Sequence, residues 1–499
     1  MICSILLLSN LALLQQGAPA KAQDAQEKPQ DENVSIVIPN GSAKRTIQLP
    51  TGEVRYTATW GQIPIRSDAG ETECRMFYVA YTKDGEPIGK RPLTFAFNGG
   101  PGSATIWLHF GALGPKRAPM KDDGSLGAPP YAPVDNSECW LDFSDVVMID
   151  APGTGFSRLV KQDFAPKYFG VRQDVTAFAK FIQGFITEKN RWSSPLFVCG
   201  ESYGGIRGSA LSAELFNNGI ALNGFISVSG TSNFMTLDGM RGNDLTYLGF
   251  FPTFANTAFY HHKLSAQFKS VEQTTAAAKE FVVKEYGPAL LRGDALTDAE
   301  KDHIAQRMSE LIGVSKQFCL GSNLRIPEWA FFRELLRNEG LTVGRFDSRL
   351  TVKQENRSDS GIVSDPSDDA TGAPFITPLN DYYRSDLGVK TDMPYLPGAN
   401  VYPWKEDEGR YSETATDLRN LMAKNPHFKV LYCCGYYDLA CPFYATIYTV
   451  DHMGLDAEQR SRVSYAYYPA GHMMYIEKGS RKKFHDDAAA FVRECLTGK

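Results

Sequence analysis

Hydrophobic positions along the chain occur in two arrangements. Between residues 53 and 81 apolar and polar residues alternate, which is typical of antiparallel strands. Further along, short continuous apolar runs predict buried strands at 93–97, 146–149, 196–198, 225–228 and 430–434. The segments 175–187 and 205–216 are predicted to be helices between these runs. Strands that alternate with helices predict an α/β fold, with a mostly parallel central sheet flanked by helices.

The alternation is interrupted between residues 234 and 404. Helical stretches are expected at 254–286, 298–311 and 327–338, and a Ser-, Asp-, Gly- and Pro-rich segment follows at 355–374. We interpret 234–404 as an insertion that caps the sheet, because long excursions of this kind commonly form active-site lids. A plain surface excursion is the alternative. The insertion divides the α/β core into a first part, 34–233, and a second part, 405–499.

The N-terminal residues have the pattern of an export signal. Residues 5–14 form an apolar run too short to span a bilayer, and two small-x-small cleavage patterns follow at 18–20 and 20–22. We therefore expect a signal peptide at 1–22, a polar linker at 23–33, and a secreted or periplasmic protein with no membrane span in its mature form. No Lys or Arg precedes the apolar run, and a disordered apolar tail is the alternative.

Charge and cysteine usage exclude several functional classes. The formal net charge of -5 and the pI near 6.0 give no basic surface, so we expect no nucleic-acid partner. The nine cysteines form no C-x-x-C pair and no zinc-type spacing, so no metal or other cofactor is predicted. Cys74, Cys139, Cys319 and Cys495 are candidates for disulfides. The alternative is that most cysteines are small buried apolar residues. The oligomeric state stays open.

A nucleophile motif stands between a predicted strand and a predicted helix. Residues 200–204 read Gly-Glu-Ser-Tyr-Gly and fit G-x-S-x-G, in which the serine occupies a strained turn with its hydroxyl exposed. The motif requires a preceding strand and a following helix, and both are predicted here. Ser202 is therefore the candidate nucleophile. A chance match on a strand-to-helix turn is the alternative.

The candidate acid and base follow the serine in the order that α/β-hydrolases require, Ser then Asp then His. Asp438 lies just past a predicted strand, at the carboxyl end where ligands meet such sheets. Three histidines come after it, and His452 and His485 have helix-like, charged surroundings. His472 instead follows a predicted strand, in a loop, so we expect it to be the base that Asp438 orients. A structural histidine is the alternative.

A glycine-rich loop is the candidate oxyanion hole. Residues 98–102, Asn-Gly-Gly-Pro-Gly, directly follow the predicted strand at 93–97. Glycines let backbone N–H groups approach a developing oxyanion, and the N–H group after the nucleophile supplies the second donor. A purely structural glycine turn is the alternative.

These motifs together closely resemble the serine carboxypeptidase family, and favour a secreted member of bacterial type. Five stretches carry the resemblance in the family's order and spacing. They are FNGGPGSATIWLHFGALGP at 97–115, DVVMIDAPGTGFS at 145–157, LFVCGESYGG at 196–205, CGYYDLACP at 434–442 and YPAGHMMY at 468–475. The likeness runs from about residue 50 to the end of the chain, but no family motif matches the insertion at 234–404.

The resemblance implies the α/β-hydrolase fold and a role for each matched residue. The implied roles are the triad for Ser202, Asp438 and His472, the oxyanion hole for Gly100 and Tyr203, and binding of the terminal carboxylate of a peptide substrate for Asn98, Gly99 and Glu201. A protonated Glu201 could share its proton with that carboxylate, which favours acid pH and a free C-terminus. A solvent-exposed spacer in the turn is the alternative for Glu201.

Three positions depart from the family pattern. Ala112 stands where the family has a second acid, Ser103 replaces a cysteine, and Tyr436 replaces an aspartate. None of these changes removes a member of the triad. We therefore expect a serine carboxypeptidase that works through an acyl-enzyme. An esterase or acyltransferase with the same triad is one alternative, and a non-catalytic peptide- or lipid-binding protein is another.

Overall fold

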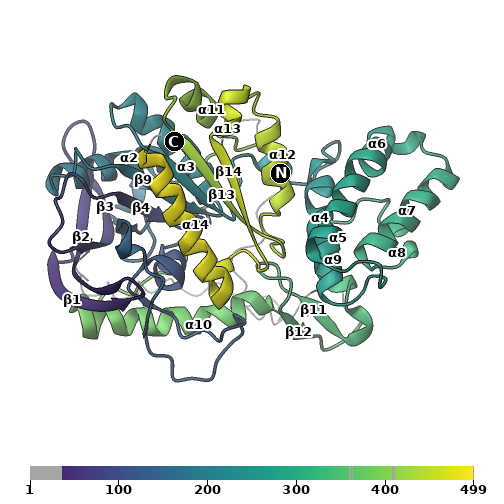
Figure 1. Ribbon diagram of the computed structural model, residues 1–499, viewed down its shortest axis with the longest axis horizontal. Helices are drawn as coiled ribbons and strands as arrows, with labels where there is room; N and C mark the ends of the chain where they lie inside the picture. Colours follow the sequence, from purple (N-terminus) through teal and green to yellow (C-terminus); the bar gives the residue numbers. More distant parts are fainter. Residues whose placement is uncertain (1–35, 359–360, 362–363, 407–410, 498–499) are drawn as a thin grey trace, which may run out of the picture.

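The computed structural model describes residues 36–358, 361, 364–406 and 411–497, and its centre is a ten-stranded sheet (Figure 1). The strand order is β1-β2-β3-β7-β4-β9-β10-β13-β14, with β8 paired to β3. The strands are β1 Gly41–Leu49, β2 Gly52–Arg66, β3 Thr72–Lys83, β4 Leu93–Phe97, β7 Asp145–Ile149, β8 Arg158–Leu159, β9 Leu196–Glu201, β10 Gly224–Val228, β13 Lys429–Gly435 and β14 Val463–Tyr468. All six strands from β7 to β14 in this order run parallel, whereas β1, β2 and β3 are antiparallel. The predicted α/β-hydrolase architecture is confirmed.

The burial of each strand follows its sequence pattern. Every residue of β4, β7 and β10 is buried, as their uninterrupted apolar runs predict for strands covered on both faces. Along β1, which lies at the edge of the sheet, exposed and less exposed residues alternate. The central strands are therefore enclosed, and their carboxyl ends open toward the loops that carry the candidate site.

Helices cover both faces of the sheet, as the alternation of strands and helices predicts, and the predicted helices at 175–187 and 205–216 are α2 Val171–Glu188 and α3 Gly204–Asn217. One face packs against α2, α3, α11 Ala415–Lys424 and α12 Phe443–Asp451. The other packs against α1 Ile106–Leu108, α10 Pro366–Asp381 and α14 Lys478–Thr497. Shorter elements are α13 Ala457–Ser461 and the two-residue strands β5 Lys116–Arg117 and β6 Val134–Asp135.

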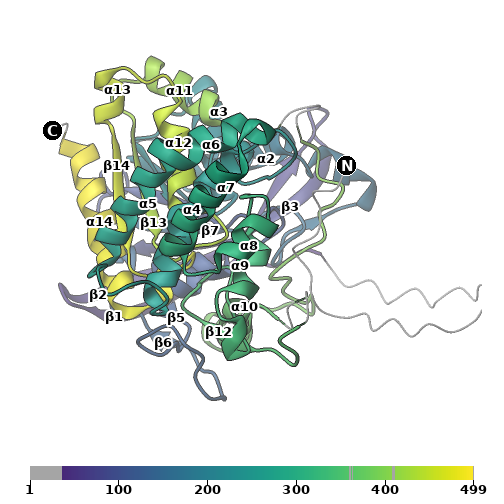
Figure 2. The ribbon, with the colours of Figure 1, turned by 90° about the vertical axis from the view of Figure 1, so that its right-hand side faces the viewer.

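A separate group of helices stands beside the sheet and has an apolar core of its own (Figure 1). Figure 2 shows these helices in front of the sheet. They are α4 Leu245–Tyr260, α5 Val271–Phe281, α6 Gly287–Arg292, α7 Asp298–Ile312, α8 Lys316–Gly321 and α9 Glu328–Glu334, followed by β11 Leu341–Val343 and β12 Thr351–Lys353. The predicted helical stretch 254–286 is interrupted between α4 and α5, where Ser270 caps α5 by accepting from the Gln273 N–H group.

The Ser-, Asp-, Gly- and Pro-rich segment 355–374, for which no helix is predicted from the sequence, contributes its second half to helix α10. Asp365 accepts a hydrogen bond from the N–H group of Ser367, and Pro366 occupies the first helical position, where its missing N–H is harmless. Phe375 and Leu379 then pack against the sheet. Capping and tertiary burial therefore outweigh the helix-breaking composition.

Two groups of sequence predictions stay predictions. The signal peptide at 1–22 and the linker at 23–33 lie outside the described residues. The boundaries of the core parts, 34–233 and 405–499, and of the insertion, 234–404, also stay predictions. Within the described part of the chain, no helix is long and apolar enough to cross a membrane.

Candidate active site

The candidate nucleophile lies in a sharp turn between β9 and α3. Ser202 has a φ angle of 63°, in the left-handed region that residues other than glycine seldom adopt. The turn also requires a close backbone approach, because a Cβ atom on Gly200 would lie 2.4 Å from the carbonyl oxygen of Gly204. Glu201 and Tyr203 are buried, while Ser202 keeps part of its surface exposed. The turn therefore presents the serine as G-x-S-x-G predicts.

Asp438 and His472 meet across neighbouring strand ends. Asp438 Oδ2 lies 2.8 Å from His472 Nδ1, and both side chains are buried. The other carboxylate oxygen, Oδ1, accepts from the N–H groups of Ala440 at 2.8 Å and Cys441 at 2.9 Å. Three hydrogen bonds thus fix the carboxylate. Because the aspartate accepts from Nδ1–H, Nε2 of His472 is left as the basic nitrogen.

Strand β10 holds the serine loop and the histidine loop together. The N–H group of Ser202 donates to the Val228 carbonyl at 3.0 Å, and Ser229 Oγ donates to the His472 carbonyl at 2.6 Å. Among the described residues, no hydrogen bond joins the Ser202 side chain to His472. In serine hydrolases without substrate this bond is often long and tightens only in the complex.

The charge of His472 is set by opposing effects. Burial lowers the pKa of this imidazole, because a charged ring is poorly solvated there, whereas the Asp438 carboxylate and Glu201 raise it. The raising effects are larger in sum, so the pKa of His472 lies above its ordinary value of 6.5. A proton accepted by this ring is therefore stabilised.

Two backbone N–H groups beside Ser202 are available as oxyanion donors. A Cβ atom on Gly99 would lie 2.4 Å from the nitrogen of Tyr203, so the glycine loop and the serine turn are in direct contact. Gly100 has a φ angle of 106°, a conformation that favours glycine. Within the described chain, neither Gly100 N–H nor Tyr203 N–H donates to another group. Both donors are therefore free to bind an oxygen of a ligand.

Glu201 is enclosed by polar partners beside the candidate nucleophile. It is 2 % exposed, and Tyr475 Oη donates to its Oε2 at 2.6 Å. Burial raises the pKa of Glu201 to about 7, although the positive charge on His472 and hydrogen bonds from Tyr475 and Asn98 act in the opposite direction. The interpretation of Glu201 as an exposed spacer is therefore wrong.

Asn98 is held in a defined orientation next to this carboxyl group. Its Oδ1 atom accepts from the N–H group of Leu108 at 3.0 Å, which leaves the amide NH₂ to face Glu201 and Tyr475. Sequence reasoning assigned no role to Tyr475. Its position three residues after His472, inside the stretch YPAGHMMY, was the available signal.

The departures from the family pattern have local structural consequences. Ala112 is buried and offers no carboxyl group, so Glu201 lacks a second acid from that position. Ser103 accepts a hydrogen bond from Trp107 Nε1 at 3.0 Å. Tyr436 stacks on Tyr467, with ring centroids 5.5 Å apart. The site thus carries fewer acidic side chains than the family pattern.

The cysteines follow the apolar interpretation. All eight cysteines in the described part of the chain are free thiols, including the disulfide candidates Cys74, Cys139, Cys319 and Cys495. Seven are buried and Cys495 is partly buried. No group of three or more metal-ligating side chains occurs among the described residues.

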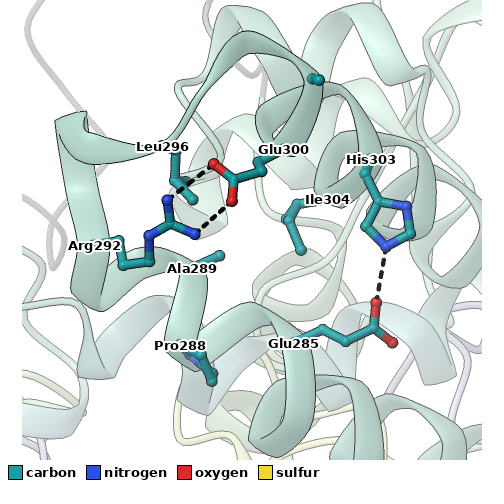
Figure 3. Close-up of a pocket in the computed structure, with 9 residues that line it drawn as sticks. Glu285, Pro288, Ala289, Arg292, Leu296, Glu300, His303 and Ile304 are labelled. Atoms are coloured by element: carbon teal, nitrogen blue, oxygen red, sulfur yellow. Dashed lines mark hydrogen bonds and ion pairs between the residues drawn. The ribbon is translucent and has the colours of Figure 1, made fainter.

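A cavity of about 380 Å³ lies among the separate helices, between α6 and α7 (Figure 3). Its charged groups are paired with one another, since Arg292 binds Glu300 at 2.6 and 2.9 Å and His303 lies 3.3 Å from Glu285. The rest of its lining is mainly apolar, with Ala289 and Ile304 among the residues. It contains none of the predicted catalytic residues, so we place the candidate chemistry at Ser202.

Part of the chain is similar to known serine carboxypeptidases. It is 30% identical over 148 residues to the serine-type carboxypeptidase F of Aspergillus niger, covering 29% of this chain and 24% of that protein. It is 28% identical over 162 residues to the retinoid-inducible serine carboxypeptidase of Mus musculus, covering 32% of this chain and 31% of that protein. These matches thus span only a quarter to a third of either relative. The family model described as Serine carboxypeptidase matches residues 50–482, and the chain therefore belongs to the serine carboxypeptidase family.

Proposed function

We propose that this protein is a serine carboxypeptidase, which removes the C-terminal residue of a peptide through an acyl-enzyme. The observation that carries the proposal is Glu201, a buried carboxyl group directly before the candidate nucleophile, with a pKa raised to about 7. An acid that stays protonated in mildly acidic solution can donate a hydrogen bond to a substrate carboxylate. A general esterase would have no need of such a group.

The proposed acylation step uses the three groups around the turn. His472 Nε2 accepts the proton of Ser202 as Oγ attacks the scissile carbonyl, and the imidazolium then donates that proton to the leaving amine. Asp438 holds the ring through Nδ1 and stabilises its positive charge. The N–H groups of Gly100 and Tyr203 stabilise the oxyanion. Water then hydrolyses the acyl-enzyme with His472 as the base again.

Recognition of the free C-terminus is assigned to Asn98, Gly99 and Glu201. Below pH 7 the neutral Glu201 donates its proton to the terminal carboxylate in a short, charge-assisted hydrogen bond. Above pH 7 the ionised Glu201 repels that carboxylate. Since Ala112 supplies no second acid, the preference for acid pH depends on this one group.

The nucleophile is tested by Ser202→Ala. We expect this variant to lose labelling by a fluorophosphonate and to lose activity by several orders of magnitude, because the triad acts as a unit. The measurement is probe incorporation together with turnover of a peptide that has a free C-terminus. The base is tested by His472→Ala, which we do not expect to keep full activity. His452→Ala changes an exposed histidine and is the matched control, which should keep full activity. Stoichiometric labelling of Ser202→Ala would contradict the assignment.

An esterase with the same triad is the second candidate, and the missing acid at Ala112 favours it. It predicts hydrolysis of a small ester, with no cleavage of peptides at any pH. Carboxypeptidase activity predicts cleavage of free-acid peptides in preference to their amides. A paired free-acid and amide peptide, assayed from acid to neutral pH, separates the two.

Export to the periplasm or the medium is part of the proposal. The apolar run at 5–14 and the small residues before position 23 support it. Amino-terminal sequencing of the protein from cell fractions is the test. A mature chain that begins near residue 23 and is found outside the cytoplasm supports export, and a full-length cytoplasmic chain contradicts it.

A further inference from the structure

Residues 345–349, which follow the helical group and β11, lie directly against the loops of the candidate acid and base. We call this segment the brace. The N–H group of His472 donates to the Phe346 carbonyl at 2.5 Å, and that of Leu439 donates to the Arg345 carbonyl at 3.0 Å. The N–H group of Ser348 donates to the Tyr437 carbonyl at 3.1 Å. The brace is therefore bonded to the histidine itself and to both neighbours of Asp438.

The packing between the brace and the histidine loop leaves no free space. A Cβ atom on Gly471 would lie 2.2 Å from the Phe346 carbonyl oxygen and 2.6 Å from Asp347 Cα. The ring of Phe346 lies 5.1 Å from the ring of His472, measured between centroids. The backbone and the imidazole of His472 thus both rest on residues of the brace.

A partly buried ion pair in the brace spans the two loops. Arg349 Nη2 lies 2.6 Å from Asp347 Oδ2 and Nε lies 2.9 Å from Oδ1, and the two side chains are 11% and 3% exposed. Arg349 Nη1 donates to the Pro469 carbonyl in the histidine loop at 2.8 Å. The same guanidinium lies 5.8 Å from the ring centroid of Tyr437 in the aspartate loop. One side chain therefore contacts both loops.

Ser348 connects the brace to the helical group. Its Oγ lies 2.6 Å from Thr257 Oγ1 on α4 and donates to the Tyr437 carbonyl at 3.0 Å. Its carbonyl oxygen lies 2.7 Å from Nε2 of His261, which follows α4. Hydrogen bonds therefore run without a gap from α4, through Ser348, to the residue before Asp438.

We propose that Arg349 and Ser348 are positioning residues, and that the brace holds His472 and Asp438 in the geometry that proton transfer requires. The inference rests on the proposed function, in which those two residues form the triad. Neither positioning residue needs to touch the substrate. The insertion would then supply part of the support of the catalytic centre in addition to any covering role.

The first test is Arg349→Ala, with Arg325→Ala as the matched control. Arg325 also forms a two-pronged pair, with Asp244 at 2.7 and 2.8 Å, but away from the triad loops. We expect Arg349→Ala to lower kcat by about 10- to 100-fold with KM changed less than about twofold, because small displacements of reacting groups are costly. Arg325→Ala should leave kcat unchanged. Arg349→Lys should recover part of the loss, since a single ammonium keeps only part of a forked contact.

The second readout does not depend on activity. Hydrogen exchange at 437–439 and 470–472 should rise in Arg349→Ala, and also in the milder Ser348→Ala, but not in Arg325→Ala. Unchanged exchange, or equal losses of kcat in Arg349→Ala and Arg325→Ala, would overturn the inference. If exchange rises while wild type cleaves no peptide or ester, the brace stands and the proposed function fails.

A pH profile separates positioning from a general loss of folded protein. Asp438 raises the pKa of His472, so a loosened contact should lower that pKa. The rising limb of kcat/KM for an ester substrate, which lacks the terminal carboxylate, should therefore move to lower pH in Ser348→Ala, a change that removes no charge near His472. A profile reduced in height but unmoved would indicate that folded enzyme is lost without any change at His472, and would overturn the inference.

Discussion

Among single residues, the buried carboxyl group of Glu201 lowers the stability of the folded protein at neutral pH and is also the group proposed to bind the substrate carboxylate. Its ordinary pKa of 4.5 rises to about 7 in the folded protein. The folded state therefore holds a proton that the unfolded state releases between these values. Stability falls as pH rises through this window, by roughly 3 kcal/mol in total. A group that is held at this cost beside a nucleophile is a candidate for function.

Glu201→Gln tests both consequences. An amide donates a hydrogen bond at every pH, so we expect the acid preference of kcat/KM for a free-acid peptide to flatten. The variant should also be more stable than wild type above pH 7, and this gain should shrink as pH falls and vanish below pH 4.5, where wild-type Glu201 is protonated in both states. Peptide kinetics and urea unfolding from about pH 4 to 8 measure these effects. Unchanged profiles in both assays would contradict the role of this carboxyl group.

At the scale of elements, the start of α10 joins helix capping to the candidate site. Asp365 caps the helix through Ser367 N–H at 3.0 Å, and both of its oxygens accept from the N–H group of Arg345 at 3.2 Å. Arg345 is the first residue of the brace. The cap therefore links the helix to the segment that supports His472.

Asp365→Ala and Thr297→Ala remove comparable N-caps, and Thr297 caps α7 through the N–H group of Glu300. Each change should cost about 1 kcal/mol of stability. Only Asp365→Ala should also lower kcat, because only that cap holds Arg345. Urea unfolding and peptide kinetics of both variants are the measurements. An equal effect of the two changes on kcat would show that the Asp365 contact with the brace has no catalytic importance.

Elements were predicted well from the sequence where a short run of residues by itself determines which side chains are buried. The run 93–97 coincides with β4, because a strand enclosed on both faces must be apolar throughout. Helix α10 was not predicted from the sequence. Its Pro- and Asp-rich start is stabilised by the cap at Asp365 and by packing of Phe375 against the central sheet, whose strands are distant in sequence. Such tertiary contacts leave no periodic signal in a short window.

The choice of candidate site residues rests on local signals of the same kind. Ser202, Asp438 and His472 follow strands in a fixed chain order, so motif and order are enough to choose them. The brace contacts these loops from about 90 or more residues away in sequence, as in the bond between Ser348 and Tyr437. No local pattern predicts such a pairing.

At the scale of the whole molecule, the helical group and the sheet are coupled at the candidate site. Leu439, the residue after Asp438, belongs to the apolar core of the helical group. Helix α4 also packs on α12, where a Cβ atom on Gly249 would lie 3.3 Å from the Cβ of Ala445. The core of the helical group therefore reaches the loop that carries the candidate acid.

This coupling predicts that activity is lost when the helical group unfolds. The rings of Phe254 on α4 and Phe331 on α9 stack with centroids 4.0 Å apart, and both are buried. Phe254→Ala should destabilise this core by about 3–5 kcal/mol. We expect the variant to lose activity at a lower urea concentration than wild type, because Leu439 and the brace lose their support. At the same urea concentration the 261–270 connection should become cleavable by protease. Both changes should occur before the sheet unfolds.

Phe185→Ala is the matched control. Its ring packs on Phe95 and Tyr78 in the core between α2 and the sheet, and not in the core of the helical group. Its loss should lower overall stability, with activity and total helical signal disappearing in one transition. Urea titrations that follow turnover, circular dichroism and limited proteolysis together distinguish the two patterns. Activity that persists in Phe254→Ala after the 261–270 connection has become cleavable would show that the triad loops keep their geometry without the helical group. The coupling through Leu439 and Ser348 would then be a packing contact with no consequence for turnover.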